Sequence, residues 1–324
     1  MKARDDAMTL NWSNPLIPQR ADPHLSLHAG RYWFTASVPG FDAIELRSAA
    51  RIEDLPHAAP TTIWTRRAQG PASWHIWAPE LHRVDGRWLI YFAGGERDDI
   101  WKIRMHVLEN AHEDPAQGEW IERGQIRTPL DDFALDATTF AHGGEQYLCW
   151  AEADPSRQGK TNLYLATLAN AWTLKSAPTR ISEAVLPWER VGFAVNEGPA
   201  VLQRHGRVLI AYSAAATDAN YCMGLLWADA AAELLDASVW HKSPVPVFAS
   251  ANGQYGPGHN SFTTTPDGKT DLLVYHARNY REIVGDPLHD PNRHARVQPF
   301  EWRADGLPAF GQPQPDGPVQ EAQA

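Results

Sequence analysis

The segment Gly86-Arg-Trp-Leu-Ile-Tyr-Phe-Ala93 consists of a turn glycine, a short run of aromatic and aliphatic residues, and a small residue at its end. Four further segments share this form, and they are Gly30-Arg-Tyr-Trp-Phe-Thr-Ala-Ser37, Gly144-Glu-Gln-Tyr-Leu-Cys-Trp-Ala151, Gly206-Arg-Val-Leu-Ile-Ala-Tyr-Ser213 and Gly268-Lys-Thr-Asp-Leu-Leu-Val-Tyr-His276. Their glycines are spaced 56, 58, 62 and 62 residues apart. Near-even spacing of this kind indicates an internal repeat.

The repeat unit reads as a β-hairpin followed by further strands. A second apolar run and a polar tip precede each glycine, as in Glu80-Leu-His-Arg-Val-Asp-Gly86, which is typical of a hairpin turn. About four strands per unit of roughly sixty residues are typical of a propeller blade. The sequence therefore predicts an all-β fold, a five-bladed β-propeller with its active site at the central channel. We expect one domain over residues 1–310, with hairpin turns near residues 30, 86, 144, 206 and 268, and a poorly ordered tail over residues 311–324.

The composition excludes several classes of protein. Hydrophobic residues make up 43% and charged residues 21%, as in soluble globular proteins, and there is no run of about 18 apolar residues for a membrane helix. The 39 acidic and 29 basic residues give a net charge of −10, which argues against a nucleic-acid partner. Cys149 and Cys222 lie in apolar runs, so buried thiols are favoured over a disulfide. The first residues lack the apolar core of a signal peptide, so we expect a cytoplasmic protein, or a secreted one if a leader was removed.

Acidic residues recur on the strands expected to be innermost. Counting back eight residues from the turn glycine gives Asp22, Ala78 and Asp136, and counting back nine gives Glu197 and His259. Carboxylates gathered around one axis repel each other, which costs stability and points to a task. Glycosidic cleavage needs one protonated and one ionised carboxyl group. The structural alternative is a channel that holds a cation or ordered water.

These residues resemble glycoside hydrolase family 43. The resemblance extends from about Asn14 to Trp302, and its motifs are Ala21-Asp-Pro23, Trp74-His-Ile-Trp-Ala-Pro-Glu80, Leu135-Asp-Ala-Thr138, Asn196-Glu-Gly-Pro199 and Gly258-His-Asn260. It is most similar to the exo-acting branch that removes L-arabinofuranose from α-1,5-linked arabinan or arabino-oligosaccharides. The 14 tryptophans suit such a ligand because indole faces stack on sugar rings, although tryptophan is also a common core residue.

The resemblance also implies residue roles in an inverting reaction. Asp22 would activate water as general base, Glu197 would protonate the leaving oxygen, and Asp136 would tune the pKa of Glu197. His259 would bind a Ca²⁺ or Na⁺ ion in the channel. The expected substrate-binding residues are His24, Trp77, Phe193, Asn196 and Arg296. Trp77 is equally consistent with a core position, and His24 shares the strand face of Asp22 because side chains alternate along a strand.

Three other functions stay open at this level. A β-xylosidase or a xylan side-chain arabinofuranosidase would use the same residues on another pentoside. A non-catalytic carbohydrate-binding propeller would bind without turnover. A retaining fructan-cleaving enzyme would need its own nucleophile motif, which Arg20-Ala-Asp-Pro23 lacks. The loops around Asp98–Trp101 and His276–His294 are expected to wall the pocket.

Overall fold

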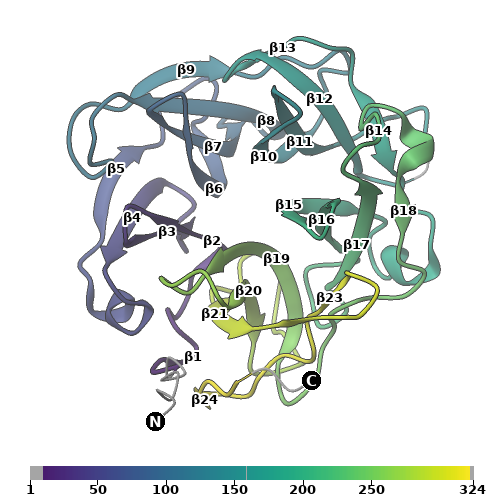
Figure 1. The fold of residues 1–324 in the computed structure, drawn as a ribbon. Helices are drawn as coiled ribbons and strands as arrows, with labels where there is room; N and C mark the ends of the chain where they lie inside the picture. The colour runs from purple at the N-terminus through teal and green to yellow at the C-terminus, as the bar shows by residue number, and fades with distance from the viewer. Residues whose placement is uncertain (1–9, 158, 322–324) are drawn as a thin grey trace.

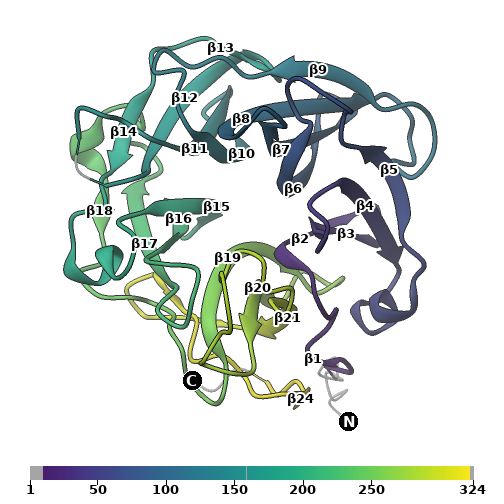
Figure 2. The same cartoon turned by 180° about the vertical axis from the view of Figure 1, so that it is seen from behind.

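The computed structural model describes residues 10–157 and 159–321. Five antiparallel β-sheets are arranged as blades around a central axis (Figures 1 and 2), so the predicted five-bladed propeller is confirmed. The innermost strands of the blades are β2 (Ala21–His28), β6 (Trp74–Val84), β10 (Ala134–His142), β15 (Asn196–Arg204) and β19 (Tyr255–Thr264).

Each blade is built outward from its innermost strand in chain order. The second strands are β3 (Arg31–Ser37), β7 (Arg87–Glu96), β11 (Glu145–Glu152), β16 (Arg207–Ala214) and β20 (Asp271–Arg278). The third strands are β4 (Ala43–Ala49), β8 (Asp99–Asn110), β12 (Asn162–Asn170), β17 (Cys222–Asp229) and β21 (His294–Pro299). The outer strands of the first four blades are β5 (Thr61–Thr65), β9 (Ile121–Gln125), β13 (Thr173–Leu174) with β14 (Thr179–Ser182), and β18 (His241–Lys242).

The remaining regular elements are short. They include the pair β22 (Glu301–Trp302) and β23 (Pro308–Ala309), and the 3₁₀-helices η1 (Ile52–His57), η2 (Pro187–Arg190) and η3 (Ala237–Val239). In the part of the chain that the structure describes, no helix has the length and apolar character needed to cross a bilayer.

The repeated glycines lie where the backbone needs them. Four inner hairpins turn at two residues with positive φ, as type I′ turns require, and these pairs are Ala29–Gly30, Asp85–Gly86, Gly143–Gly144 and His205–Gly206. The fifth hairpin has a longer connection, between Thr264 and Asp271, with Gly268 inside it. Because this turn is longer, His259 lies nine residues before its turn glycine, whereas Asp22 and Asp136 lie eight residues before theirs.

Apolar side chains fill the spaces between blades. Tyr91 and Met105 of the second blade belong to one cluster with Trp150 and Tyr164 of the third. Most tryptophans are buried or half-buried in this way, whereas the Trp101 side chain is 55% exposed. Tryptophan is therefore mainly core material here. Cys149 and Cys222 are free and buried, as predicted.

The N-terminal segment closes the ring by pairing with the outer edge of the last blade. The Leu16 amide donates to the Ala295 carbonyl (2.8 Å), and the Ala295 amide donates to the Ile17 carbonyl (3.0 Å). The Asn14 side chain donates to the Val297 carbonyl (3.0 Å) and accepts from the Val297 amide (2.9 Å). The N-terminal segment thus bonds to the outer strand of the fifth blade, which links the start of the chain to the last blade.

The segment after residue 310 is packed on this closure, unlike the poorly ordered tail expected from its composition. β24 (Gly317–Pro318) pairs with β1 (Ser13–Asn14), and the Val319 amide donates to the Trp12 carbonyl (3.0 Å). Val319 is buried. The tail therefore has backbone partners and buries apolar surface, two features that a Pro- and Gln-rich composition does not reveal. Residues 322–324 of the expected tail lie outside the described residues.

Replacing Asn14 with alanine should lower the free energy of unfolding by about 1–3 kcal/mol, because it leaves the Val297 amide buried without its partner. Urea denaturation of the variant measures this change. Asn170→Ala is the matched control, since Asn170 is exposed and accepts only from the nearby Trp172 amide. Equal stability of the two variants would contradict the role of Asn14 in ring closure.

Candidate active site

Each innermost strand contains a β-bulge near its start, and one residue of every bulge has a left-handed backbone. These residues are Asp22 (φ 54°), Ala78 (φ 45°), Asp136 (φ 58°), Gly198 (φ 54°) and His259 (φ 43°). The equivalent residue of the fourth blade is thus Gly198, and Glu197 precedes it by one. Glu197 therefore does not occupy the position equivalent to Asp22 and Asp136, although the count along the sequence suggested that it did. A Cβ atom at residue 198 would also lie 3.2 Å from the His259 ring, so any residue other than glycine would crowd that ring.

Hydrogen bonds between neighbouring blades hold four of these bulges. The Ala78 amide donates to Ser37 Oγ (2.8 Å) and the His259 amide to Ser213 Oγ (2.7 Å). The Asp22 amide donates to His276 Nδ1 (3.0 Å), which closes the series from the fifth blade to the first. The Gly198 amide donates to Asp136 Oδ2 (2.9 Å), so this carboxylate directly supports the backbone beside Glu197.

Asp22 is surrounded by groups that stabilise its ionised form. Ser37 Oγ donates to Asp22 Oδ2 (2.6 Å), and His259 Nδ1 and Arg293 Nη1 each lie 3.4 Å from Asp22 Oδ1. Burial raises the pKa of Asp22, but the charges of His259 and Arg293 and the Ser37 hydrogen bond outweigh it and lower the pKa well below its ordinary value. Asp22 is therefore an ionised carboxylate over the whole physiological range.

Glu197 has the opposite electrostatic environment. Burial and the nearby charge of Asp136 raise the pKa of Glu197 to about 7, although the Tyr221 hydroxyl donates to Glu197 Oε1 (2.8 Å) and opposes the shift. Burial also raises the pKa of Asp136, and the Asp22 charge adds to it. The site therefore contains one ionised carboxylate and a pair of carboxyl groups that retain a proton near neutral pH.

His259 lies between the carboxylates, with Nδ1 3.4 Å from Asp22 Oδ1 and 4.0 Å from Asp136 Oδ2. Burial lowers its pKa, but the surrounding Asp136, Asp22 and Glu197 charges outweigh burial and raise it. Ca²⁺ takes about six to eight oxygen ligands, water included, and the carboxylates beside His259 supply only part of such a set. A channel ion at His259 stays a prediction, and no chemistry is assigned to it.

Two of the expected substrate-binding residues are engaged elsewhere. Asn196 is fully buried, donates to Glu189 Oε1 (3.0 Å) and accepts from Ser182 Oγ (2.6 Å), so it supports β15 behind Glu197. Arg296 is also fully buried, and its Nη2 donates to Asp316 Oδ1 (2.6 Å). Both expectations are corrected, because the side chains point into the structure rather than into a pocket.

The other three expected substrate-binding residues differ in their surroundings. Trp77 is 8% exposed and stacks on His75, with ring centroids 4.5 Å apart, so it is largely a core residue. Phe193 is 47% exposed, and Lys160 Nζ lies 4.1 Å from its ring centroid. His24 lines a cavity further along the inner strands, beyond the acids, which separates it from Asp22. Of these three, only Phe193 presents a large exposed surface.

Sequence reasoning missed four residues that contact the acids. Ser37 and His276 end two of the repeated segments at equivalent positions, a signal that the repeat contained. Arg293 comes from the loop expected to wall the pocket, but nothing in its spacing marked it. Tyr221 directly precedes β17 and has no counterpart in the repeat pattern.

Residues 12–308 match the family described as glycosyl hydrolases family 43. The chain belongs to this family. It is 54% identical over 312 residues to an extracellular exo-α-(1→5)-L-arabinofuranosidase of Streptomyces avermitilis, covering 95% of this chain and 65% of the relative. An enzyme of the same name from Streptomyces chartreusis is 51% identical, with 85% of each chain covered. The crystal structure of an α-L-arabinofuranosidase from Lactobacillus brevis superposes with a TM-score of 0.91 at 51% identity, covering 94% of this chain and 97% of the other.

The chain spans about 65% of the length of the Streptomyces avermitilis relative. Both Streptomyces relatives are extracellular enzymes, which contradicts the expectation of a cytoplasmic protein. That expectation depended on the composition of the first few residues alone, and two relatives above 50% identity outweigh it.

Replacing Glu197 with glutamine should stabilise the protein by about 1–3 kcal/mol at pH 8, because each unit of pKa difference between the folded and unfolded states corresponds to about 1.4 kcal/mol. The folded pKa is raised from 4.5 to about 7, so the wild type is destabilised as the pH rises through this range. The gain should shrink as the pH falls from 8 towards 4.5, which urea denaturation at several pH values measures. Glu282→Gln is the control, since its side chain is 95% exposed. A Glu197→Gln variant no more stable than wild type at pH 8 would contradict the raised pKa.

Proposed function

We propose that this protein is an inverting exo-α-L-arabinofuranosidase that releases terminal L-arabinose from α-1,5-linked arabinan or arabino-oligosaccharides. The observation that carries the proposal is the opposite electrostatic environment of two carboxyl groups. Asp22 is held ionised by His259 and Arg293, whereas burial and Asp136 keep a proton on Glu197 near neutral pH. This is the pairing of base and acid that glycoside hydrolysis requires.

In the proposed reaction Asp22 removes a proton from a water molecule as the water oxygen attacks the anomeric carbon. The glycosidic C–O bond breaks while Glu197 donates its proton to the leaving oxygen. Asp136 keeps the pKa of Glu197 raised and holds the adjacent backbone through the Gly198 amide. Because the water attacks the face opposite the leaving group, an α-linked substrate gives β-L-arabinose as the first product.

The substrate class is supported by the relatives and by exposed aromatic surface. The Streptomyces relatives are named for α-1,5-linked arabinofuranose. Trp101, whose ring lies 6.3 Å from that of Trp77, lines a cavity of about 560 Å³ together with Lys160. Lys160 in turn contacts the exposed ring of Phe193. Aromatic faces beside a cavity suit the apolar faces of a furanose ring.

The test is a digest of linear α-1,5-arabinan and of arabinotriose, followed by proton NMR from the first minutes. We expect monomeric arabinose, initially as the β-anomer. Glu197→Ala and Asp22→Ala should each lower the rate on arabinotriose by about 10²–10⁴-fold, the usual contribution of a general acid or base. Glu282→Ala should leave the rate unchanged.

Different failures would overturn different parts of the proposal. The α-anomer as first product would mean retention, and oligomers as first products would mean endo cleavage. Arabinose release that persists in Glu197→Ala would remove Glu197 as the acid. Release of xylose but not arabinose from the matching nitrophenyl pentosides would change the substrate class.

The alkaline limb of the pH–rate profile should depend on Tyr221. Its hydroxyl donates to Glu197 and favours the ionised form, so Tyr221→Phe should raise the pKa of Glu197 further above about 7. Activity falls when Glu197 loses its proton, so the alkaline limb of kcat/KM should move up by about one pH unit. Tyr32→Phe is the control, because that hydroxyl donates to the Thr264 carbonyl. A limb that stays in place or moves down in Tyr221→Phe would contradict the assignment.

A further inference from the structure

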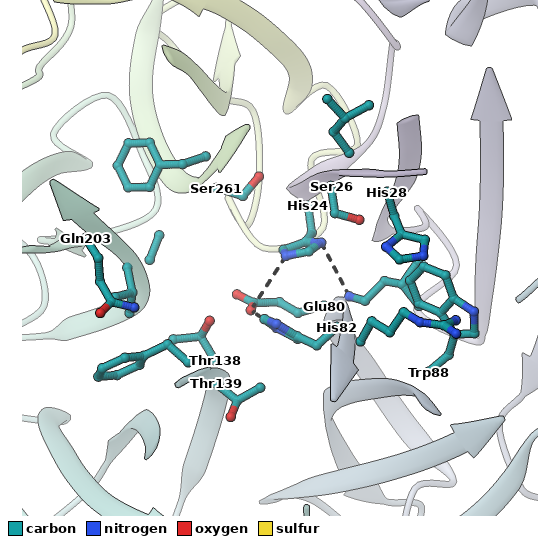
Figure 3. A pocket seen from close by; sticks show the side chains of 17 residues that line it. His24, Ser26, His28, Glu80, His82, Trp88, Thr138, Thr139, Gln203 and Ser261 are labelled. Carbon is teal, nitrogen blue, oxygen red and sulfur yellow. Dashed lines mark hydrogen bonds and ion pairs between the residues drawn. The ribbon is translucent and has the colours of Figure 1, made fainter. Parts of the chain in front are cut away.

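A second polar site lies further along the inner strands than the acids. A cavity of about 300 Å³ is lined by residues from all five innermost strands, including His24, Glu80, His82, Thr138, Gln203 and Ser261 (Figure 3). Each of these residues follows the bulge of its own strand by at least two positions. At about 3.3 Å per strand residue, the cavity is displaced along the axis from the carboxylates of the candidate active site.

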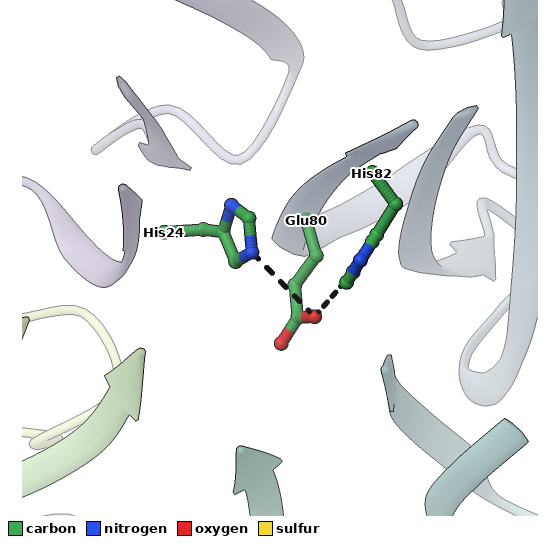
Figure 4. A group of neighbouring side chains, drawn as sticks. All are labelled: His24, Glu80 and His82. Carbon is green, nitrogen blue, oxygen red and sulfur yellow. Dashed lines mark hydrogen bonds and ion pairs between the residues drawn. The ribbon is translucent and has the colours of Figure 1, made fainter. Parts of the chain in front are cut away.

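Three potential metal ligands converge on this cavity. His24 comes from β2, while Glu80 and His82 are alternate residues of β6 and therefore share one strand face. Glu80 Oε2 lies 2.8 Å from His82 Nε2 and 4.0 Å from His24 Nε2. One ligand atom from each residue lies within 4.8 Å of the others. Figure 4 shows both imidazoles directed at the same carboxylate.

We propose that His24, Glu80 and His82 form a binding site for a divalent transition-metal ion such as Zn²⁺. Two imidazole nitrogens and one carboxylate are a common three-residue Zn²⁺ set, and water from the cavity supplies the fourth ligand. The same set suits Ca²⁺ poorly, because Ca²⁺ takes about six to eight oxygen ligands. The bound ion would connect the first blade to the second and take no part in the bond-breaking step.

Binding requires a local rearrangement that the contacts allow. The carboxylate of Glu80 accepts a hydrogen bond from His82 Nε2. On binding, the ion takes the place of the proton between these atoms, and that proton moves to the other ring nitrogen. The Leu81 amide approaches His24 Nδ1 at 3.4 Å, longer than an ordinary hydrogen bond, so this contact is readily given up when His24 binds metal through Nε2.

The experiment is a calorimetric titration of chelator-treated, full-length protein with Zn²⁺. We expect about one saturable site per chain and a rise in Tm on Zn²⁺ addition. His82→Gln should weaken binding by more than about 10-fold, since even the loss of a residue that only orients a ligand costs about 10–100-fold. His28→Gln is the matched control, because His28 lines the same cavity outside the ligand group. Ca²⁺ should give no saturable binding at this site.

Unchanged Zn²⁺ affinity in His82→Gln, or no saturable binding by the wild type, would overturn the proposal and leave Glu80 and His82 as a partly buried hydrogen-bonded pair. If His82→Gln fails to fold, X-ray absorption of the Zn²⁺-loaded wild type decides the matter. Two imidazole nitrogens and carboxylate or water oxygens at about 2.0–2.2 Å would support the site. An oxygen-only shell would overturn it.

Discussion

The arrangement of the candidate active site depends on one backbone constraint, the left-handed residue in the bulge of every innermost strand. For a residue other than glycine this conformation costs about 1–2 kcal/mol, and four of the five blades have such a residue there. Hydrogen bonds from the neighbouring blade compensate, as between the Asp22 amide and His276. A β-bulge changes the direction of the side chain at its left-handed residue. The bulges of the first, third and fifth blades therefore bring Asp22, Asp136 and His259 together.

Bringing these charged groups together lowers the stability of the folded chain. It also gives neighbouring carboxyl groups different pKa values, which proton transfer requires. Asp136 and Glu197 both have raised pKa values because they are buried and lie near other carboxyl groups. Asp22 escapes this shift because Arg293 and His259 adjoin it. A difference in local surroundings thus separates an ionised carboxylate from a protonated carboxyl group within one small region. The raised pKa of Glu197 lowers the free energy of unfolding near neutral pH. The same raised pKa keeps a proton on this carboxyl group.

The propeller was predictable because its turns need glycine at regular intervals, and this periodicity is visible in a single sequence. Asp22 and Asp136 occupy equivalent positions in this periodicity, whereas Glu197 lies one residue before the equivalent position of its blade. Side-chain direction was misjudged at Asn196, because neighbouring residues of a strand face opposite sides, and Asn196 is therefore turned away from Glu197 and toward Glu189. Arg293 and Tyr221 come from segments outside the repeat, so only the folded chain shows that they contact the acids. The contact of Arg296 was not predictable either, because its partner Asp316 lies in a segment whose composition gave no sign of packing.

The inner strands also connect the acid cluster electrostatically to the cavity beyond it. Glu80 lines that cavity, and its charge contributes to the raised pKa of both Asp136 and His259. His24 and His82 in turn favour the ionised form of Glu80. Because Glu80, Asp136 and His259 are buried, water screens the interactions among them less than at the surface. The charge held at Glu80 therefore makes a small contribution to the raised pKa of Asp136, which connects the cavity electrostatically to the acid cluster.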